Sequence, residues 1–204
     1  MSVVKVFRSV AFADLAREMN RFGAMLHFEA EAMFGKELVT QALRQRICTR
    51  RKTALGQTLF LLFPGRRLAG MAGQFTPTDD GLMNSVCLRD IGQRLEHAGY
   101  AIDLTVRKRA LVFTPPGRRV VVLAQHAGYT LAALRRLHRE LVVGGTFDQI
   151  QVFTYLPPEG VSELTAFLYD PPRRSQPIDA HELAVFGLPQ PTPNRDLTLP
   201  AGVV

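Results

Sequence analysis

The sequence predicts an α+β fold built in two parts, and three observations predict it. In the first part, apolar residues recur at spacings of three and four up to Ile47, and two strand-like runs follow. In the second part, the same patterns give the order helix, three strands, helix, strand. The charge divides with them, because residues 1–73 hold 12 basic and 5 acidic side chains whereas residues 74–204 hold 13 of each.

Length and composition allow one large domain or two small ones. The chain has 204 residues, and its 47% hydrophobic content is enough to build real cores. We expect an N-terminal domain over residues 1–73, an α/β domain over residues 82–168, and a Pro-rich tail without a core of its own over residues 169–204. Turn-forming residues mark the linker between the domains, namely Gly65, Gly70, Gly73, Pro77 and the polar run 76–81.

Two helices are expected before the basic region. The first has an apolar side made of Phe12, Leu15, Ala16, Met19 and Phe22. It should end at Gly23. Before it, apolar and polar residues alternate weakly over residues 2–10, which fits a short strand or an arm. The second covers residues 26–34, and Gly35 can supply the tight turn that leads into the next helix.

A third helix is predicted over residues 36–47, with two contrasting sides. A rotation of about 100° per residue separates an apolar set from a polar set. The apolar set is Leu38, Val39, Ala42, Leu43 and Ile47, and the polar set is Glu37, Thr40, Gln41, Arg44 and Gln45. Arg46 departs from this pattern, because its angle falls on the apolar side and its guanidinium must extend past it or meet the ribbon.

A basic two-stranded ribbon is expected after this helix. Its first strand, residues 49–53, carries three consecutive cations, so charged side chains project to both faces. Its second strand, residues 58–63, is nearly all apolar and must be buried, and the ribbon continues through residues 64–67. From Lys36 to Arg67 there are eight basic residues and one acidic residue, a surplus equal to the net charge of +7 of the whole chain.

The helix and ribbon of residues 36–63 resemble the outline of a winged helix-turn-helix, in which one helix enters the major groove of DNA and the ribbon lies on the backbone. The resemblance implies that the chain binds double-stranded DNA. The structural alternative is that the polar side of the helix and the charges of the ribbon are solvated surfaces. The side chains expected to contact DNA are Lys36, Thr40, Gln41, Arg44, Gln45, Arg50, Arg51, Lys52, Arg66 and Arg67.

In the second part, a helix over residues 82–98 has one continuous apolar stripe and a stop at Gly99. Three strands are expected over residues 101–106, 110–114 and 119–124. A helix over residues 128–142 then buries its leucines and exposes Arg135, Arg136 and Arg139, which can add to a DNA surface. A strand over residues 149–155 and a short helix over residues 162–168 complete the series.

This order resembles the core of the restriction-endonuclease-like fold. In that family a metal-dependent site needs an acidic residue on the second strand and a Glu-x-Lys pair on the third. The third strand here reads Arg119 to Ala124 without a carboxylate or lysine, and Asp103 lies on the first strand. The resemblance therefore implies a catalytically empty relative, not an enzyme, that serves interaction or dimerisation.

Residues 10–155 also resemble the replication-relaxation proteins of plasmids and integrating elements. The shared features are the helix and ribbon of residues 36–63, the break near Gly73, the helix that ends in residues 97–100, and the helix of residues 131–141 after Tyr129. The likeness is one of arrangement. It implies a DNA-binding regulator or accessory replication factor and carries over no catalytic residue.

Other kinds of site find little support in the sequence. Cys48 and Cys87 are isolated, the five histidines have no metal-ligand spacing, and no phosphate-binding or dinucleotide motif is present. We expect no metal, no small-molecule cofactor, no membrane contact and a cytoplasmic location, with duplex DNA and a second copy of the chain as partners. The alternatives are a divergent metal-dependent nuclease and a protein-interaction module with an acidic partner.

Overall fold

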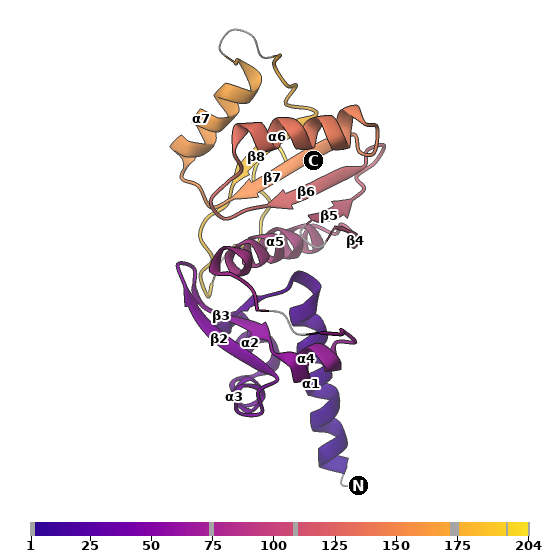
Figure 1. Cartoon of the computed structure of the whole chain (residues 1–204), viewed down its shortest axis with the longest axis vertical. Coiled ribbons are helices and arrows are strands. Elements are labelled where there is room, and N and C mark those ends of the chain that lie inside the picture. Colours follow the sequence, from indigo (N-terminus) through magenta and orange to yellow (C-terminus); the bar gives the residue numbers. More distant parts are fainter. Residues whose placement is uncertain (1–2, 74–75, 108–109, 172–175, 195, 204) are drawn as a thin grey trace. The chain divides into compact units, whose positions relative to one another are not determined.

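The computed structural model describes residues 3–73, 76–107, 110–171, 176–194 and 196–203 (Figure 1). Within those ranges the fold is α+β, with seven α-helices, a three-stranded antiparallel sheet and a five-stranded mixed sheet. The chain forms two compact units, one made of residues 1–89 with 192–194 and the other of residues 90–191 with 195–204. The division therefore falls later than the expected linker near Gly73.

The first unit alternates short strands with helices. Its order is α1 (Val3–Phe22), β1 (Met25–Leu26), α2 (His27–Phe34), α3 (Lys36–Arg44), β2 (Cys48–Thr53), β3 (Gly56–Leu61), α4 (Phe63–Leu68) and the first half of α5 (Asp79–His97). The sheet order is β1-β3-β2, and Leu59 in the central strand lies opposite both Met25 and Arg50. Buried apolar side chains of α1, α2, α3 and the sheet form one core cluster.

Helix α1 is longer than the sequence indicates. The predicted apolar side is buried and the predicted stop is confirmed, since Gly23 has a φ of 95° and donates its N–H to the Met19 carbonyl. Residues 3–10, for which a strand or an arm was expected, continue the same helix instead. The weak alternation of valines there is a local preference that the helix starting from Ala11 overrides.

Helix α3 ends at Arg44, three residues before the expected end at Ile47. Arg46 has a φ of 56° and donates its N–H to the Leu43 carbonyl, while Ile47 donates to the Ala42 carbonyl at 2.9 Å. These two hydrogen bonds close the helix as a Schellman motif. Arg46 is consequently exposed, and the apolar side of α3 is buried or half-buried as expected.

Residues 64–67, which were expected to continue the ribbon, form helix α4 instead. Pro64 lies in the first turn, where its fixed φ favours a helix and its missing N–H costs nothing. Gly65, expected in the linker, is buried inside α4 against the backbone of Ile47. A Cβ atom at this position would lie 2.2 Å from the Ile47 carbonyl oxygen, so the close approach requires glycine.

A buried guanidinium joins three helices of the first unit. Arg89 of α5 is fully buried, and its Nη1 donates to Glu18 Oε1 of α1 at 2.9 Å. Its Nε lies 3.4 Å from Glu29 Oε2 of α2, and its Cζ lies 5.6 Å from the centre of the Phe22 ring. Glu29 Oε2 also accepts the N–H of Leu26 at the start of α2. The sequence did not indicate this burial.

The second unit is built on the five-stranded sheet. Its strands are β4 (Ile102–Arg107), β5 (Ala110–Phe113), β6 (Val120–Ala124), β7 (Gln149–Thr154) and β8 (Leu183–Gly187), in that order across the sheet. β4, β5 and β6 pair antiparallel, and β6, β7 and β8 pair parallel. The helices are the end of α5, α6 (Leu131–His138), a π-helical turn η1 (Arg139–Val143) and α7 (Pro158–Tyr169). The predicted order of helix, three strands, helix, strand is confirmed.

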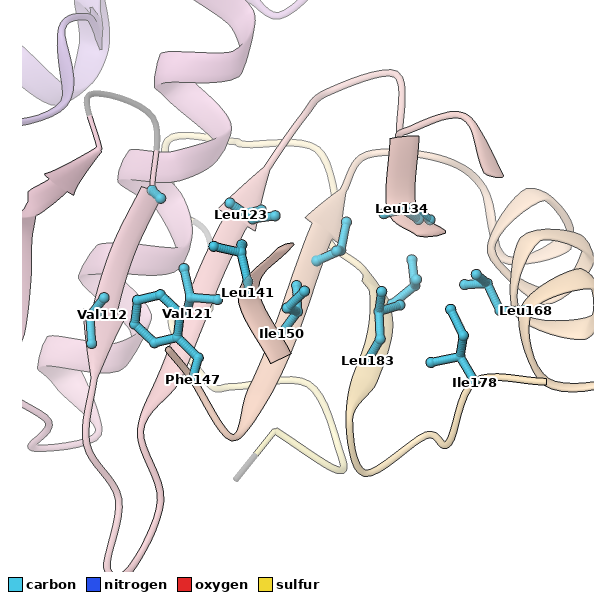
Figure 2. Packing of buried hydrophobic residues seen from close by; sticks show 13 residues of the cluster. Val112, Val121, Leu123, Leu134, Leu141, Phe147, Ile150, Leu168, Ile178 and Leu183 are labelled. Carbon is cyan, nitrogen blue, oxygen red and sulfur yellow. The ribbon is translucent and has the colours of Figure 1, made fainter. Parts of the chain in front are cut away.

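One face of this sheet carries an apolar core. Figure 2 shows Leu134, Leu141 and Leu168 from the helical segments gathered against side chains of the strands, among them Val121 and Ile150. Part of the segment 169–204, expected to be a tail without a core, takes part in this packing. Ile178 and Leu183 are buried in the same cluster. β8 forms the fifth strand of the sheet through its parallel pairing with β7, which satisfies backbone hydrogen-bonding groups of both strands.

A second buried ion pair lies inside this unit. Arg94 Nε donates to Asp90 Oδ1 at 3.0 Å, and the hydroxyl of Tyr155 donates to Asp90 Oδ2 at 3.0 Å. Arg94 Nη1 also donates to the Thr198 carbonyl, so the C-terminal segment is held to α5.

Within the described residues, no helix is long and apolar enough to cross a membrane.

Replacing Gly65 by Ala should destabilise the first unit. The added Cβ would collide with a backbone oxygen, and overpacking of this kind costs about 1–3 kcal/mol. Gly160→Ala is the matched control in α7, where a Cβ meets only ordinary contacts at 3.7 Å and beyond, and we expect a gain of up to about 1 kcal/mol. Urea denaturation measures both, and an unchanged unfolding free energy for Gly65→Ala would contradict the packing described.

Arg89→Met should lower the unfolding free energy of the chain by about 3–5 kcal/mol, because it leaves Glu29 buried without its cation. Arg17 offers a control, since its ion pair with Asp14 is exposed and Arg17→Met should cost less than about 1 kcal/mol. Denaturation of the two variants under the same conditions compares them. Equal losses would show that the buried pair has no special role.

Candidate nucleic-acid interface

An open groove in the first unit runs between α3 and β2 and has a volume of about 610 Å³. We call it the α3–β2 groove. α3 contributes positions 36, 40, 43 and 44, which recur along one side of the helix. The remaining lining comes from α2, the turn after α3, β2 and Leu62. The full lining is His27, Glu31, Lys36, Thr40, Leu43, Arg44, Arg46, Cys48, Thr49, Arg50 and Leu62.

The groove is strongly positive. Its lining includes four cations, Lys36, Arg44, Arg46 and Arg50, and one carboxylate, Glu31. The carboxylate of Glu31 has a neighbour on α2, since His27 Nε2 lies 3.9 Å from Glu31 Oε1. Among the described residues, the four cationic side chains make no hydrogen bond or ion pair, so their charges are available to a ligand.

The predicted polar side of α3 divides in the structure. Thr40 and Arg44 line the groove together with Lys36, one helical turn apart from each other. Gln41 lies outside it, and its Nε2 donates to Glu37 Oε1 at 2.9 Å. Gln45 caps the end of the helix and is exposed, also outside the groove. Only part of the expected base-contacting set is therefore gathered in one place.

The three consecutive cations of β2 divide as well, because alternate residues of a strand face opposite sides. Arg50 and Lys52 are exposed. Arg51 faces the other way, where its Nη1 donates to the Pro77 carbonyl at 2.8 Å and to Asp79 Oδ1 at 3.0 Å. Its Cζ also lies 5.2 Å from the centre of the Phe60 ring. Arg51 thus fastens the ribbon to the start of α5.

Arg66 and Arg67 lie on α4 and outside the groove lining. Arg66 Nε donates to the Gly73 carbonyl at 3.0 Å, which closes the loop after α4. The Cζ of Arg67 lies 5.9 Å from the centre of the Phe63 ring. The structure does not bring these two cations together with α3, because the segment that carries them is a helix and not the end of a ribbon.

Arg46, His27 and Thr49 line the groove although the sequence did not mark them as site residues. Arg46 was expected on the apolar side of a longer helix. Its left-handed backbone costs about 1–2 kcal/mol for a residue with a Cβ. The sequence offers one signal of this position. No glycine lies between Arg44 and the buried Ile47, where α3 ends, so a residue with a side chain must take the left-handed conformation that closes the helix.

The arginines of α6 are engaged within the second unit. Arg135 donates to the carbonyls of Gln176 at 2.7 Å and Phe167 at 3.3 Å, near the end of α7. Arg136 is exposed with Glu140 4.0 Å away. His138 Nε2 lies 2.8 Å from Glu182 Oε2, beside β8. Arg135 and Arg136 thus have local contacts, and the third expected arginine, Arg139, is exposed at the start of η1.

Within the described ranges, no group of three or more His, Cys, Asp or Glu side chains is placed to hold a metal ion. Asp103 is exposed on β4, and every residue of β5 and β6 is buried. Cys48 and Cys87 are both buried, and neither is disulfide-bonded.

Comparisons of the chain with protein-family models, with curated proteins and with solved structures found no match.

Cys48, in the floor of the groove, should be unreactive in the folded chain. Burial raises the pKa of its thiol to about 12, so the thiolate, which is the reactive form, is about one part in ten thousand at pH 8. Iodoacetamide labelling followed by peptide mapping should modify Cys48 only after denaturation. Rapid labelling of Cys48 in the native chain would contradict this prediction.

The raised pKa of the Cys48 thiol also affects stability. Because the thiol loses its proton more easily in the unfolded chain, its contribution to the free energy of unfolding should fall as the pH rises from 9 toward 12.

Proposed function

We propose that the first unit binds double-stranded DNA as a winged helix-turn-helix domain. The observation that carries the proposal is the α3–β2 groove, which is lined by four cations without partners in the described chain and by a single carboxylate. Phosphate neutralisation by Lys and Arg supplies most of the affinity of proteins for duplex DNA. A concave surface of this charge next to an exposed helix suits a DNA backbone.

The order of elements supports the proposal. The series α1-β1-α2-α3-β2-β3, with the sheet order β1-β3-β2, is the arrangement expected of a winged helix. Gly35 has a φ of 82° and makes the tight turn between α2 and α3 that a helix-turn-helix needs. In this arrangement α3 enters the major groove and the β2–β3 ribbon lies beside it.

The side chains fall into two roles. Thr40 and Arg44, on the middle and end of α3, suit base edges, because Arg pairs with guanine and Thr with several bases. Lys36, Arg50 and Lys52 suit phosphates, which position the protein without reading sequence. The ribbon tip is Ala54 and Leu55, so the ribbon would contact DNA through the flank of β2. We assign Arg51 and Arg66 to the fold.

We further infer that the second unit serves interaction or dimerisation and carries out no catalytic step. In that case the protein is a regulator or an accessory replication factor, as the resemblance to plasmid and integrating-element proteins implies. Arg135 of α6 donates to two carbonyls of its own unit and Arg136 lies 4.0 Å from Glu140, which leaves the first unit as the stronger candidate for DNA contact.

Changing both Arg50 and Lys52 to Ala should weaken binding to every duplex sequence. Each lost phosphate contact makes the slope of log K against log salt less negative by about 0.9, so we expect a change of about two and a weakening on the order of tenfold per contact. Fluorescence anisotropy with a random-sequence duplex across a salt series measures both quantities.

Arg51→Ala is the matched control, because it removes one cation from the same strand. It should leave the salt slope unchanged and lower thermal stability through the loss of the Asp79 and Pro77 contacts. Equal slopes for all three proteins would remove the ribbon from the interface. If the unaltered chain fails to bind a duplex even at low salt, the groove serves an acidic protein partner and the DNA proposal is wrong.

A further inference from the structure

Arg46 occupies a backbone position that glycine usually fills. It is the residue after the cap of α3 in the Schellman motif, and its φ of 56° lies in the left-handed region. Of the residues described with a positive φ, the others are all glycines. A strained residue of this kind persists only where the surrounding structure fixes it, and such residues concentrate at functional sites.

The side chain of Arg46 does nothing for the fold that would explain this strain. Among the described residues its guanidinium makes no hydrogen bond or ion pair, and the side chain is exposed. The stop of α3 depends on its backbone N–H and on that of Ile47, which a glycine would supply equally well. By contrast, Arg51, Arg66 and Arg89 of the same unit each have protein partners.

The left-handed turn directs Arg46 into the groove. α3 would otherwise continue and place the side chain on its apolar side. Instead Arg46 joins Arg44 and Arg50, so arginines from helix, turn and strand line one concavity. Thr40 of α3 lines it too, and a threonine hydroxyl can donate to an anionic oxygen.

We propose that the α3–β2 groove is a seat for one phosphate group of the nucleic-acid backbone and that Arg46 is the residue that binds it. This inference rests on the proposed DNA binding and deepens it. Guanidinium groups bind phosphate oxygens in a bidentate manner, which suits Arg better than Lys at a fixed position. The seat fixes where the backbone crosses between α3 and β2, and it contributes affinity independent of base sequence.

The test compares Arg46→Gly and Arg46→Lys with the unaltered chain. Anisotropy with a random-sequence duplex from about 50 to 200 mM salt gives the Kd and the salt slope. Arg46→Gly should weaken binding on the order of tenfold and make the slope less negative by about one. Its Tm should be unchanged or higher by up to about 5 °C, because glycine relieves the left-handed backbone. Arg46→Lys should keep the slope and show an intermediate Kd.

Arg67→Ala is the matched control, because it removes one exposed cation of the same unit outside the groove. An equal loss of affinity in Arg67→Ala would mean that net charge, not a seat, explains the effect and would overturn the inference. Unchanged binding by Arg46→Gly would overturn it while leaving the DNA proposal intact. A lowered Tm of Arg46→Gly would assign Arg46 to the fold. No duplex binding by the unaltered chain would overturn both.

Discussion

The buried guanidinium of Arg89 is the constraint on which the first unit depends. It pairs with Glu18 of α1 and Glu29 of α2, and Glu29 also accepts the first N–H of its own helix from Leu26. Removing a charged group from water is costly unless its partners are fixed, so this cluster penalises any other placement of α2 against α1 and α5. Since α3 follows α2 after the single residue Gly35, the position of the DNA-facing helix that we propose derives from this contact.

The same unit divides its arginines between structure and surface. Arg51 and Arg89 donate to a carbonyl or a carboxylate that lies 26 or more positions away in the sequence. Arg66 donates to the Gly73 carbonyl and closes a local loop. Arg44, Arg46 and Arg50 line the groove without partners in the described chain. A count of charge alone cannot separate the two groups. The groove is therefore a smaller and more specific candidate surface than the basic stretch of residues 36–67. It includes Arg46, whose strained backbone conformation is not explained by any contact of its side chain within the described chain.

Local patterns were enough to predict much of this architecture. The end of α1 at Gly23, the apolar side of α3 and the order of elements in the second unit all follow from spacing and from glycine. Some of what failed required contacts distant in sequence, and some was ambiguous locally. The partner of Arg51 is Asp79, and β8 is recognised as a strand only through its pairing with β7. α4 was missed because a short apolar run that ends in Pro-Gly fits a strand as well as a helix. Arg46 was misplaced because the periodicity does not show where α3 stops.

Arginine footprinting tests the central claim most directly, because it asks which guanidinium groups a duplex covers. The chain would be treated with an arginine-specific dicarbonyl reagent, with and without a random-sequence duplex at low salt, and the modified sites identified by mass spectrometry. Our account predicts protection of Arg44, Arg46 and Arg50, no change at the exposed Arg67 and Arg136, and no modification of the buried Arg89 in either case. Protection confined to Arg136 and its neighbours, or protection of no arginine at all, would contradict it.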